Sequence, residues 1–530
     1  MHTKWLNIKD ILWKKQNYIF NFFLIFTLIM LMMTPGIWNG NEEQYLGYAW
    51  RKSSPEALAR ISALRDTANH RFIFEYLTGF SIKNIGFEWT QALGRIIVAL
   101  LYSASLVSLF KNLKISTTAF CTIILIFFWL GESILGMEWL FRGFEPKTLA
   151  YPFVFFSFST SLKKRFGSSY LLLALATYFH FLVGGFWFFI TWLVQLYWTK
   201  NLKQTFMNSL KYLIPCIPLF FIIVVGQLQT QDSINSTPPV SWIYSHFRAP
   251  HHVAPFASKA VFMEFWYQGV ILLLGLTIIS AIIYRYSQNR IEKEFSKLVL
   301  TLNIYLFLSL FISYFDKQGV LGKFYIFRPA SITLFLTLCL YALFLQNIIS
   351  KKFSKFSISS KISLQFSFVT LVLISCLTIP SLSGHTAYKF LSKQAQSLNS
   401  FKISQHKNNF DLEQIIKKSH PTDIFLIDPN LEKDPDLIWN IKILSFERKY
   451  NRPTLVLDKF MPSTNSEIMR WYKLLNLKNN LFKEGCPSEI TKHYKIRYLL
   501  AHQNNNKVNN CGKEIYNQGG IKLIELDTEQ

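Results

Sequence analysis

The chain has 530 residues, of which 51% are hydrophobic and 17% aromatic, while only 16% are charged. Soluble domains usually carry about 25% charged residues, so this composition argues against a soluble protein. The net charge of +25 does not indicate nucleic-acid binding, because the basic residues stand in short clusters between apolar runs and no nucleic-acid motif occurs.

Apolar runs along the chain predict about 11 transmembrane helices. The first run follows four lysines, as in a signal peptide, but residues 34–38 make a poor cleavage site, so this span is expected to remain uncleaved. A helix that crosses the bilayer core needs about 20 residues, and several runs are shorter. The predicted spans are residues 18–33, 92–110, 115–130, 148–162, 168–181, 183–198, 210–228, 269–284, 298–315, 329–349 and 362–380.

Residues 168–198 are compatible with one long broken helix or with two helices that meet near Gly184 and Gly185. Only two helices keep all the basic clusters on one side of the membrane. The connections then assigned to the cytoplasm hold twenty basic residues against three acidic ones, which follows the positive-inside rule. The sequence therefore predicts a cytoplasmic N-terminus.

This topology divides the chain into two domains. Residues 1–383 are predicted to form the transmembrane domain, with external connections at 34–91, 131–147, 229–268 and 316–328. Residues 384–530 are predicted to form a small extracytoplasmic α/β domain. Strands are expected at 423–428, 454–457, 498–500 and 521–524, with a helix at 467–477. Cys486 and Cys511 lie in this domain, either bonded to each other or free.

Glu42 and Glu43 follow the first predicted span. Carboxylates at a membrane surface can act as general bases or bind Mg²⁺ or Mn²⁺. The alternative is a solvated loop that leads into an amphipathic helix at 54–69, lying flat on the membrane. On an extended loop the two side chains point to opposite sides. Glu43 is then favoured as the catalytic residue, because Tyr45 and Tyr48 flank it.

The external connection 131–147 carries Glu132 and Glu138. Ionisable groups at membrane depth are costly and tend to line a polar cavity, so both are predicted to bind substrate. Interfacial anchoring by Trp139 and Phe141 is the alternative, and it explains the aromatic residues but not the two glutamates.

Single charged residues also lie near the predicted external ends of spans. Arg95 and Arg328 either extend toward the lipid headgroups or contact a phosphate group. His180, just before Gly184 and Gly185, is interpreted as a buried polar residue rather than a ligand.

The segment 244–252 contains His246, Arg248, His251 and His252. Arginine and histidine together suit a phosphate or diphosphate as charge-assisted donors. His251 and His252 are adjacent and would point apart on a regular helix, which argues against a two-histidine metal site. The alternative is a polar loop at the membrane interface.

This layout resembles the GT-C class of membrane glycosyltransferases. Those enzymes combine many spans, an acidic residue soon after the first span, and often an external C-terminal domain. Residues 41–43 occupy the position of their first-loop acid, and Glu132 and Glu138 stand where a second acidic element often lies. The chain is also similar to bacterial membrane proteins of unassigned function that share a Phe-Arg-x-Pro-His-His element, here residues 247–252. It departs from the class in lacking a clear Asp-x-Asp and a Trp-Trp-Asp triad.

The resemblance implies a glycosyltransferase of the bacterial inner membrane. The donor would be a sugar on a polyprenyl phosphate or diphosphate, and the acceptor a glycan, lipid or protein on the outer face. Mg²⁺ or Mn²⁺, bound by Glu42 and Glu43, is the cofactor it suggests. Two alternatives use the same surface without forming a bond: a transporter or flippase of lipid-linked saccharides, and a non-catalytic component of a polysaccharide-assembly complex.

Overall fold

The computed structural model describes residues 18–33, 38–54, 71–228, 237–352, 410–433, 443–485 and 493–526. The chain divides into two compact units. Unit 1 comprises Met1–Gly36, Ala92–Pro218 and Tyr244–Gln394, and unit 2 comprises Ile37–Gln91, Leu219–Ile243 and Ala395–Gln530. The predicted span 362–380, the predicted helix 54–69 and Cys486 lie outside the described residues.

Long apolar helices dominate the described residues, as expected of an integral membrane protein. Those long and apolar enough to cross a membrane are Phe72–Leu113, Phe181–Thr199, Leu202–Val225, Lys259–Tyr286, Arg290–Phe315 and Ala330–Ile348. The shorter apolar helices include Tyr18–Met32, Thr117–Trp129 and Phe166–Phe179. The structure therefore supports a polytopic helical protein, while the predicted number of eleven spans is not confirmed.

Every predicted span up to residue 349 overlaps a helix. After Tyr18–Met32, these helices are α3 (Phe72–Leu113), α4 (Thr117–Trp129), α5 (Pro146–Leu162), α6 (Phe166–Phe179), α7 (Phe181–Thr199), α8 (Leu202–Leu228), α12 (Tyr267–Tyr286), α13 (Arg290–Phe315) and α14 (Ala330–Lys352). The main difference is α3, which begins at Phe72 rather than at residue 92. Its early part carries Lys83 and Glu88, and Gly86 at φ 80° interrupts the helical geometry.

Helices α6 and α7 form an antiparallel pair, which confirms the two-helix prediction for residues 168–198. Phe166 at the start of α6 contacts Trp198 at the end of α7, with ring centroids 6.1 Å apart. The chain leaves helical geometry at His180, which caps α7. Gly184 permits the close approach, because a Cβ there would lie 2.1 Å from Thr177 Oγ1.

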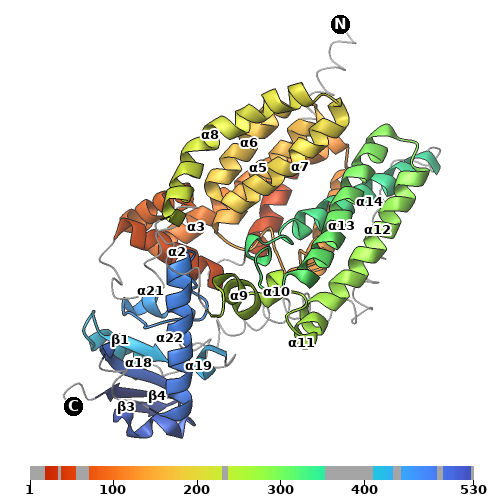
Figure 1. Cartoon of the computed structure of the whole chain (residues 1–530). Helices are drawn as coiled ribbons and strands as arrows, with labels where there is room; N and C mark the ends of the chain where they lie inside the picture. The colour runs from red at the N-terminus through yellow and green to blue at the C-terminus, as the bar shows by residue number, and fades with distance from the viewer. Residues whose placement is uncertain are drawn as a thin grey trace. The chain divides into compact units, whose positions relative to one another are not determined.

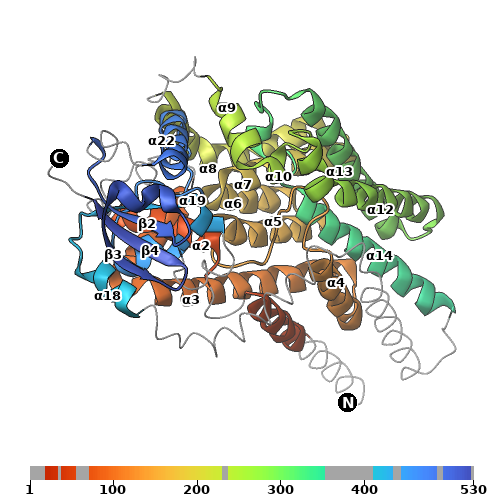
Figure 2. The same ribbon diagram turned by 90° about the horizontal axis from the view of Figure 1, so that it is seen from below.

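The membrane helices of unit 1 form two groups of neighbours. Helices α5, α6 and α7 lie side by side, and α12, α13 and α14 form the other group (Figures 1 and 2). An aromatic core joins α4, α14 and the connection 131–147, because Phe127 contacts Phe335 at 5.4 Å and Phe141 at 5.7 Å between ring centroids. Since most of these side chains are fully buried, the core holds the connection 131–147 against the helices.

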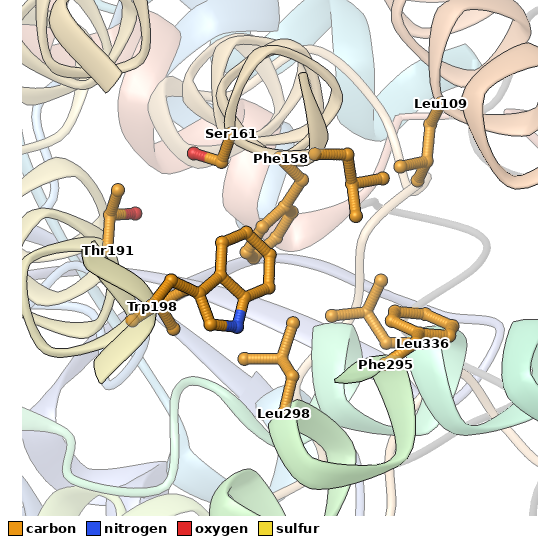
Figure 3. A pocket seen from close by; sticks show the side chains of 10 residues that line it. Leu109, Phe158, Ser161, Thr191, Trp198, Phe295, Leu298 and Leu336 are labelled. Atoms are coloured by element: carbon orange, nitrogen blue, oxygen red, sulfur yellow. The ribbon is translucent and has the colours of Figure 1, made fainter. Parts of the chain in front are cut away.

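A small apolar pocket opens between α3, α5, α7, α13 and α14. Trp198 lies between Phe158 and Leu298, with Ser161 and Thr191 as the polar groups of its lining (Figure 3). Ser161 stands near the end of α5, about 20 Å along the helix axis from the first turn. The pocket is therefore distant from the charged residues at the start of α5.

Unit 2 contains a four-stranded sheet in the order β1-β2-β4-β3. The strands are β1 (Ile424–Ile427), β2 (Ile496–His502), β3 (Gly512–Gln518) and β4 (Ile521–Leu526). Strand β1 pairs parallel with β2, and the other pairs are antiparallel. The short helices of this part of the chain are α18 (Phe410–Lys418), α19 (Pro429–Lys433) and α21 (Phe446–Tyr450), and the long one is α22 (Asn465–Glu484).

The predicted α/β character of residues 384–530 is present in the described part of that range, with two differences. Residues 454–457 form no strand, and only Thr454 makes an isolated parallel bridge to Phe425. Strand β3 was not predicted, and it joins β4 through Gly519 and Gly520, both at positive φ. Cys511 is disulfide-bonded, as one of the two sequence alternatives expected.

Candidate functional site

The connection 131–147 is a compact loop between α4 and α5. Glu132 organises it, because one carboxylate oxygen accepts hydrogen bonds from the backbone N–H groups of Leu140 (2.9 Å) and Phe141 (3.0 Å). The other oxygen accepts from Arg142 Nε at 2.7 Å. Both oxygens of Glu132 are thus engaged in holding the loop, and its predicted role in substrate binding stays a prediction.

Glu145 and Lys147 begin α5. Glu145 caps the helix together with Thr148 and accepts a 2.5 Å hydrogen bond from Trp139 Nε1. Lys147 Nζ lies 3.6 Å from the centre of the Trp139 ring and 3.9 Å from Glu145. Lys147 is 6% exposed, so this ammonium group is held in a nearly dry environment.

Glu138 is the central acid of the loop and is 2% exposed. It accepts a hydrogen bond from Lys147 Nζ at 2.9 Å, and Arg328 Nη2 lies 3.7 Å from its other oxygen. Burial alone would raise the pKa of Glu138, but Lys147, Arg328 and His252 outweigh it and lower the pKa to about 2. Glu138 is therefore a permanent anion that holds two buried cations.

Arg328 reaches this site from the segment before α14. Its Nη1 lies 3.2 Å from His180 Nε2, and its guanidinium carbon lies 4.6 Å from the centre of the Tyr325 ring. His180 comes from the break between α6 and α7. A neutral imidazole accepts at one nitrogen only, and we assign the hydrogen bond to the Arg328 contact, since the alternative, from Val183 N, is longer at 3.4 Å.

His252 completes the group from α10 (Pro250–Val253). Its Nδ1 lies 2.6 Å from the Gly136 carbonyl oxygen. Burial, together with His251, holds the pKa of His252 well below its usual range, although Glu138 acts in the opposite direction. Part of the side chain remains accessible. We name Glu138, Lys147, His180, His252 and Arg328 the Glu138 cluster.

Aromatic rings border the Glu138 cluster. The His252 ring lies 6.1 Å from Trp139, 6.0 Å from Tyr325 and 4.1 Å from His251, between ring centroids. Tyr244 in turn lies 5.8 Å from Tyr325 between ring centroids. We name Trp139, Tyr244, His251 and Tyr325 the aromatic rim. All four are partly accessible, whereas Glu138, Lys147, His180 and Arg328 are buried.

The Glu138 cluster contains residues that the sequence predicted as binding residues and residues that it did not. Glu138, His252 and Arg328 were predicted from the sequence, and the structure brings them together. Lys147 and His180 were not predicted, and His180 was interpreted as a merely buried polar residue. The signal for His180 is its position at the break between two apolar runs, where a polar side chain can project toward neighbouring connections.

The other predicted binding residues do not belong to the Glu138 cluster. His246 lies in the π-helical turn Ile243–Arg248 and shares a 2.8 Å hydrogen bond with Ser245 Oγ, and burial lowers its pKa. Arg248 ends this turn and is partly exposed. Arg95 is 3% exposed within α3. The expectation that His251 and His252 point apart is wrong, since their ring centroids are only 4.1 Å apart. The helix that carries them is a single turn, so the geometry of a regular helix does not apply.

Glu42 and Glu43 belong to unit 2 and lie in the first turn of α2 (Gly40–Ser53). The expectation of an extended loop here is wrong, because Asn39 and Glu42 form a capping box that starts a helix. Glu42 Oε2 accepts from Asn39 N at 3.2 Å and from Gln91 Nε2 at 3.0 Å.

Glu43 is held by the C-terminal part of unit 2. Arg448 Nε and Nη2 each donate to its carboxylate at 2.9 Å, and Ser445 Oγ donates to it as well. The Arg448 guanidinium also pairs with Glu88 at 2.7 Å and lies 3.9 Å from the centre of the Trp38 ring. We name these five residues, Trp38, Glu43, Glu88, Ser445 and Arg448, the Arg448 clamp.

These contacts bear on the predicted metal site. A divalent cation at Glu42 and Glu43 would compete with the Arg448 guanidinium and the helix cap for the same oxygens. The donor set therefore does not fit Mg²⁺ or Mn²⁺ as it stands. Within the described ranges, no three His, Cys, Asp or Glu side chains form a group that could hold a metal ion.

Comparison with known proteins gives no family assignment. No protein-family model matches the chain, and no curated protein matches it.

Proposed function

We propose that this protein is a membrane glycosyltransferase that uses a polyprenyl-phosphate or polyprenyl-diphosphate sugar as donor. The acceptor would be a glycan, lipid or protein at the outer face of a bacterial inner membrane, with a cytoplasmic N-terminus. The observation that carries the proposal is the Glu138 cluster, in which buried cations and an imidazole stand beside partly accessible aromatic rings.

The charges of the cluster suit an anionic ligand that arrives from outside the protein. Lys147 is tightly paired with Glu138 at 2.9 Å, whereas Arg328 is only loosely paired with it at 3.7 Å. Glu145 also lies near Lys147, so two carboxylates hold Lys147 and Arg328 is the more loosely held cation. A phosphate would therefore engage Arg328, whose planar fork binds phosphate oxygens in pairs.

The aromatic rim suits the sugar. Trp139 and Tyr325 are neighbours of His252, and aromatic faces supply large apolar contact areas with a polar edge. Tyr325 also lies under the Arg328 guanidinium. A donor lying over Tyr325 can thus place its phosphate against Arg328 and its sugar against the rim.

For this reaction the protein must accept a proton and stabilise the departing phosphate. The acceptor hydroxyl oxygen forms a bond to the anomeric carbon and loses its proton to a base. The bond between the anomeric carbon and the phosphate oxygen breaks, and the electron pair leaves with the polyprenyl phosphate, where Arg328 stabilises the charge. No step requires a metal ion at Glu42 and Glu43, and a catalytic role for Glu43 would require Arg448 to release it.

The experiment uses the full-length protein in nanodiscs. Radiolabelled polyprenyl-phosphate and polyprenyl-diphosphate hexoses are offered as a panel together with bacterial envelope glycans, lipids and proteins as acceptors, and the release of the polyprenyl phosphate or diphosphate is measured. Arg328→Lys should weaken the binding of polyprenyl phosphate about tenfold or more, because one lost charge-assisted hydrogen bond is worth about 1.5–3 kcal/mol. The exposed Arg285→Lys is the matched control and should change nothing.

Two results would refute the proposal. One is wild-type affinity for polyprenyl phosphate in Arg328→Lys. The other is a wild-type protein that releases no polyprenyl phosphate from any donor of the panel.

Transport of a lipid-linked saccharide is the second candidate, and one observation favours it. Gln195 in α7 and Asn303 in α13 are fully buried, and neither amide has a hydrogen-bond partner among the described residues. Unsatisfied polar groups inside a membrane bundle are costly and often mark a path for polar cargo. Movement of a labelled lipid-linked saccharide across proteoliposomes, without release of polyprenyl phosphate, would favour this candidate.

A further inference from the structure

We infer that His252 is the base that takes the proton from the acceptor hydroxyl, through its Nε2 atom. This inference rests on the proposed transferase function and deepens it by naming the residue. It stands on the contact between His252 and Gly136 and on the position of the ring in the aromatic rim.

The Gly136 contact fixes which nitrogen of His252 carries a proton. A carbonyl oxygen only accepts hydrogen bonds, so the Nδ1 atom, 2.6 Å from the Gly136 oxygen, must be the donor. In the neutral ring the lone pair then resides on Nε2. This is the orienting arrangement found where a histidine serves as a base: one nitrogen is held by the protein and the other faces the reactant.

His252 is also neutral when it is needed. Burial and the neighbouring His251 lower its pKa, and Lys147 acts in the same direction, while Glu138 and the hydrogen bond to the Gly136 carbonyl oppose them without reversing the shift. Tyr325 is the other titratable group whose ring borders it. The ring is therefore in its proton-accepting form at neutral pH, although its low pKa makes it a weak base.

The His252 side chain also borders the aromatic rim. His252 is only partly buried, and its Nε2 makes no hydrogen bond to any described residue. Trp139 and Tyr325 both border the ring, at 6.1 and 6.0 Å between ring centroids. A hydroxyl group positioned between these rings can reach Nε2, whereas the carboxylate of Glu138 is committed to Lys147 and Arg328.

Gly136 is a positioning residue for His252. It lies at φ +70°, and a Cβ on it would meet the His252 carbonyl oxygen at 2.9 Å and Phe327 Cβ at 3.1 Å. A larger residue would therefore displace the carbonyl group that holds Nδ1. The left-handed backbone at Gly136 and the orientation of the imidazole depend on each other.

The proton balance of the step is complete. As the acceptor oxygen bonds to the anomeric carbon, its proton passes to Nε2 and the ring becomes imidazolium. Polyprenyl phosphate departs with the electron pair of the broken bond. The imidazolium then returns the proton to water, with Glu138 stabilising the transient charge.

The test uses His252→Asn in the full-length protein. The Asn amide can still donate to the Gly136 carbonyl, but it offers no base. We expect release of polyprenyl phosphate from the hexose panel to fall by at least about a hundredfold, the lower end for loss of a general base. Binding of polyprenyl phosphate should stay within about twofold, since Arg328 is untouched. The exposed His420→Asn is the matched control and should behave as wild type.

A second variant separates chemistry from packing. His252→Ala should be inactive and should regain part of its activity with added imidazole, and the acidic limb of the wild-type pH–rate profile should disappear in His252→Asn. The inference is overturned if His252→Asn keeps the wild-type rate, or if its rate and its polyprenyl phosphate binding fall together. A wild-type protein that releases nothing would instead refute the transferase function, and the inference with it.

Discussion

Replacing Glu43 by Gln should loosen unit 2, because this residue anchors the Arg448 clamp. The side chains of Glu43 and Arg448 are 3% and 15% exposed, and two hydrogen bonds of 2.9 Å join them. Removing one partner of a buried ion pair costs about 3–5 kcal/mol. Arg448 retains Glu88, Trp38 and some contact with water, so we expect a smaller loss than this range, of about 2–3 kcal/mol.

The assay is hydrogen exchange of the backbone amides in α21 and in the first turn of α2. A loss of about 2–3 kcal/mol corresponds to an exchange rate about 30- to 150-fold faster. Glu413→Gln is the matched control, because Glu413 pairs with the adjacent Lys449 at the surface, with side chains 28% and 35% exposed. Exposed pairs are worth about 0–1 kcal/mol, so its effect should be within about fivefold.

The reasoning fails if Glu43→Gln leaves the exchange of both segments unchanged, or if Glu413→Gln has an equal effect. The same variant also tests the sequence-based prediction for Glu43. If Glu43 is a catalytic base, the rate per folded molecule falls by at least about a hundredfold. If it is an anchor only, the rate per folded molecule stays near wild type.

Two further predictions concern single residues. Burial raises the pKa of Glu447 to about 7, although Thr454 opposes the shift. The folded state therefore binds this proton more tightly than the unfolded state does. As pH rises from about 4 to above 7, the free energy of unfolding of unit 2 should fall by about 3 kcal/mol. Exchange measured across this range should show the loss, and Glu447→Gln should abolish it; a stability that rises with pH in wild type would contradict the shift. Gly184→Ala should separate α6 from α7, because its Cβ would lie 2.1 Å from Thr177 Oγ1; the thermal midpoint in detergent should fall by several degrees, whereas Gly275→Ala, with open space around it, should leave it unchanged.

The sequence was informative wherever a local pattern decides the outcome. Apolar runs located the helices, and the basic clusters chose two helices over one at residues 168–198. Short apolar runs located β1, β2 and β4. Strand β3 was missed, because Gly512–Gln518 is polar and largely exposed and so carries no apolar alternation.

The contacts of the candidate site could not be predicted from the sequence, for a different reason. Glu138, His252 and Arg328 were recognised as unusual charges in apolar surroundings, but their pairing depends on how distant connections meet. Arg328 and His180 are 148 residues apart in the chain. Glu43 attracted a catalytic interpretation because nothing near it in the sequence indicates Arg448.

The Arg448 clamp also determines when unit 2 can be completed during synthesis. Glu43 and Arg448 are separated by 405 residues. At about 5–20 residues per second, the glutamate waits about 20–80 s for its partner while the helices between them are made. During this interval the early part of α3 can already pack on α2, but the Glu43 side of α2 lacks its covering, so the cell must shield that side or tolerate its exposure. A chain that stops before α21 would leave the acid without its cation, and its first loop should then be an early target for proteases.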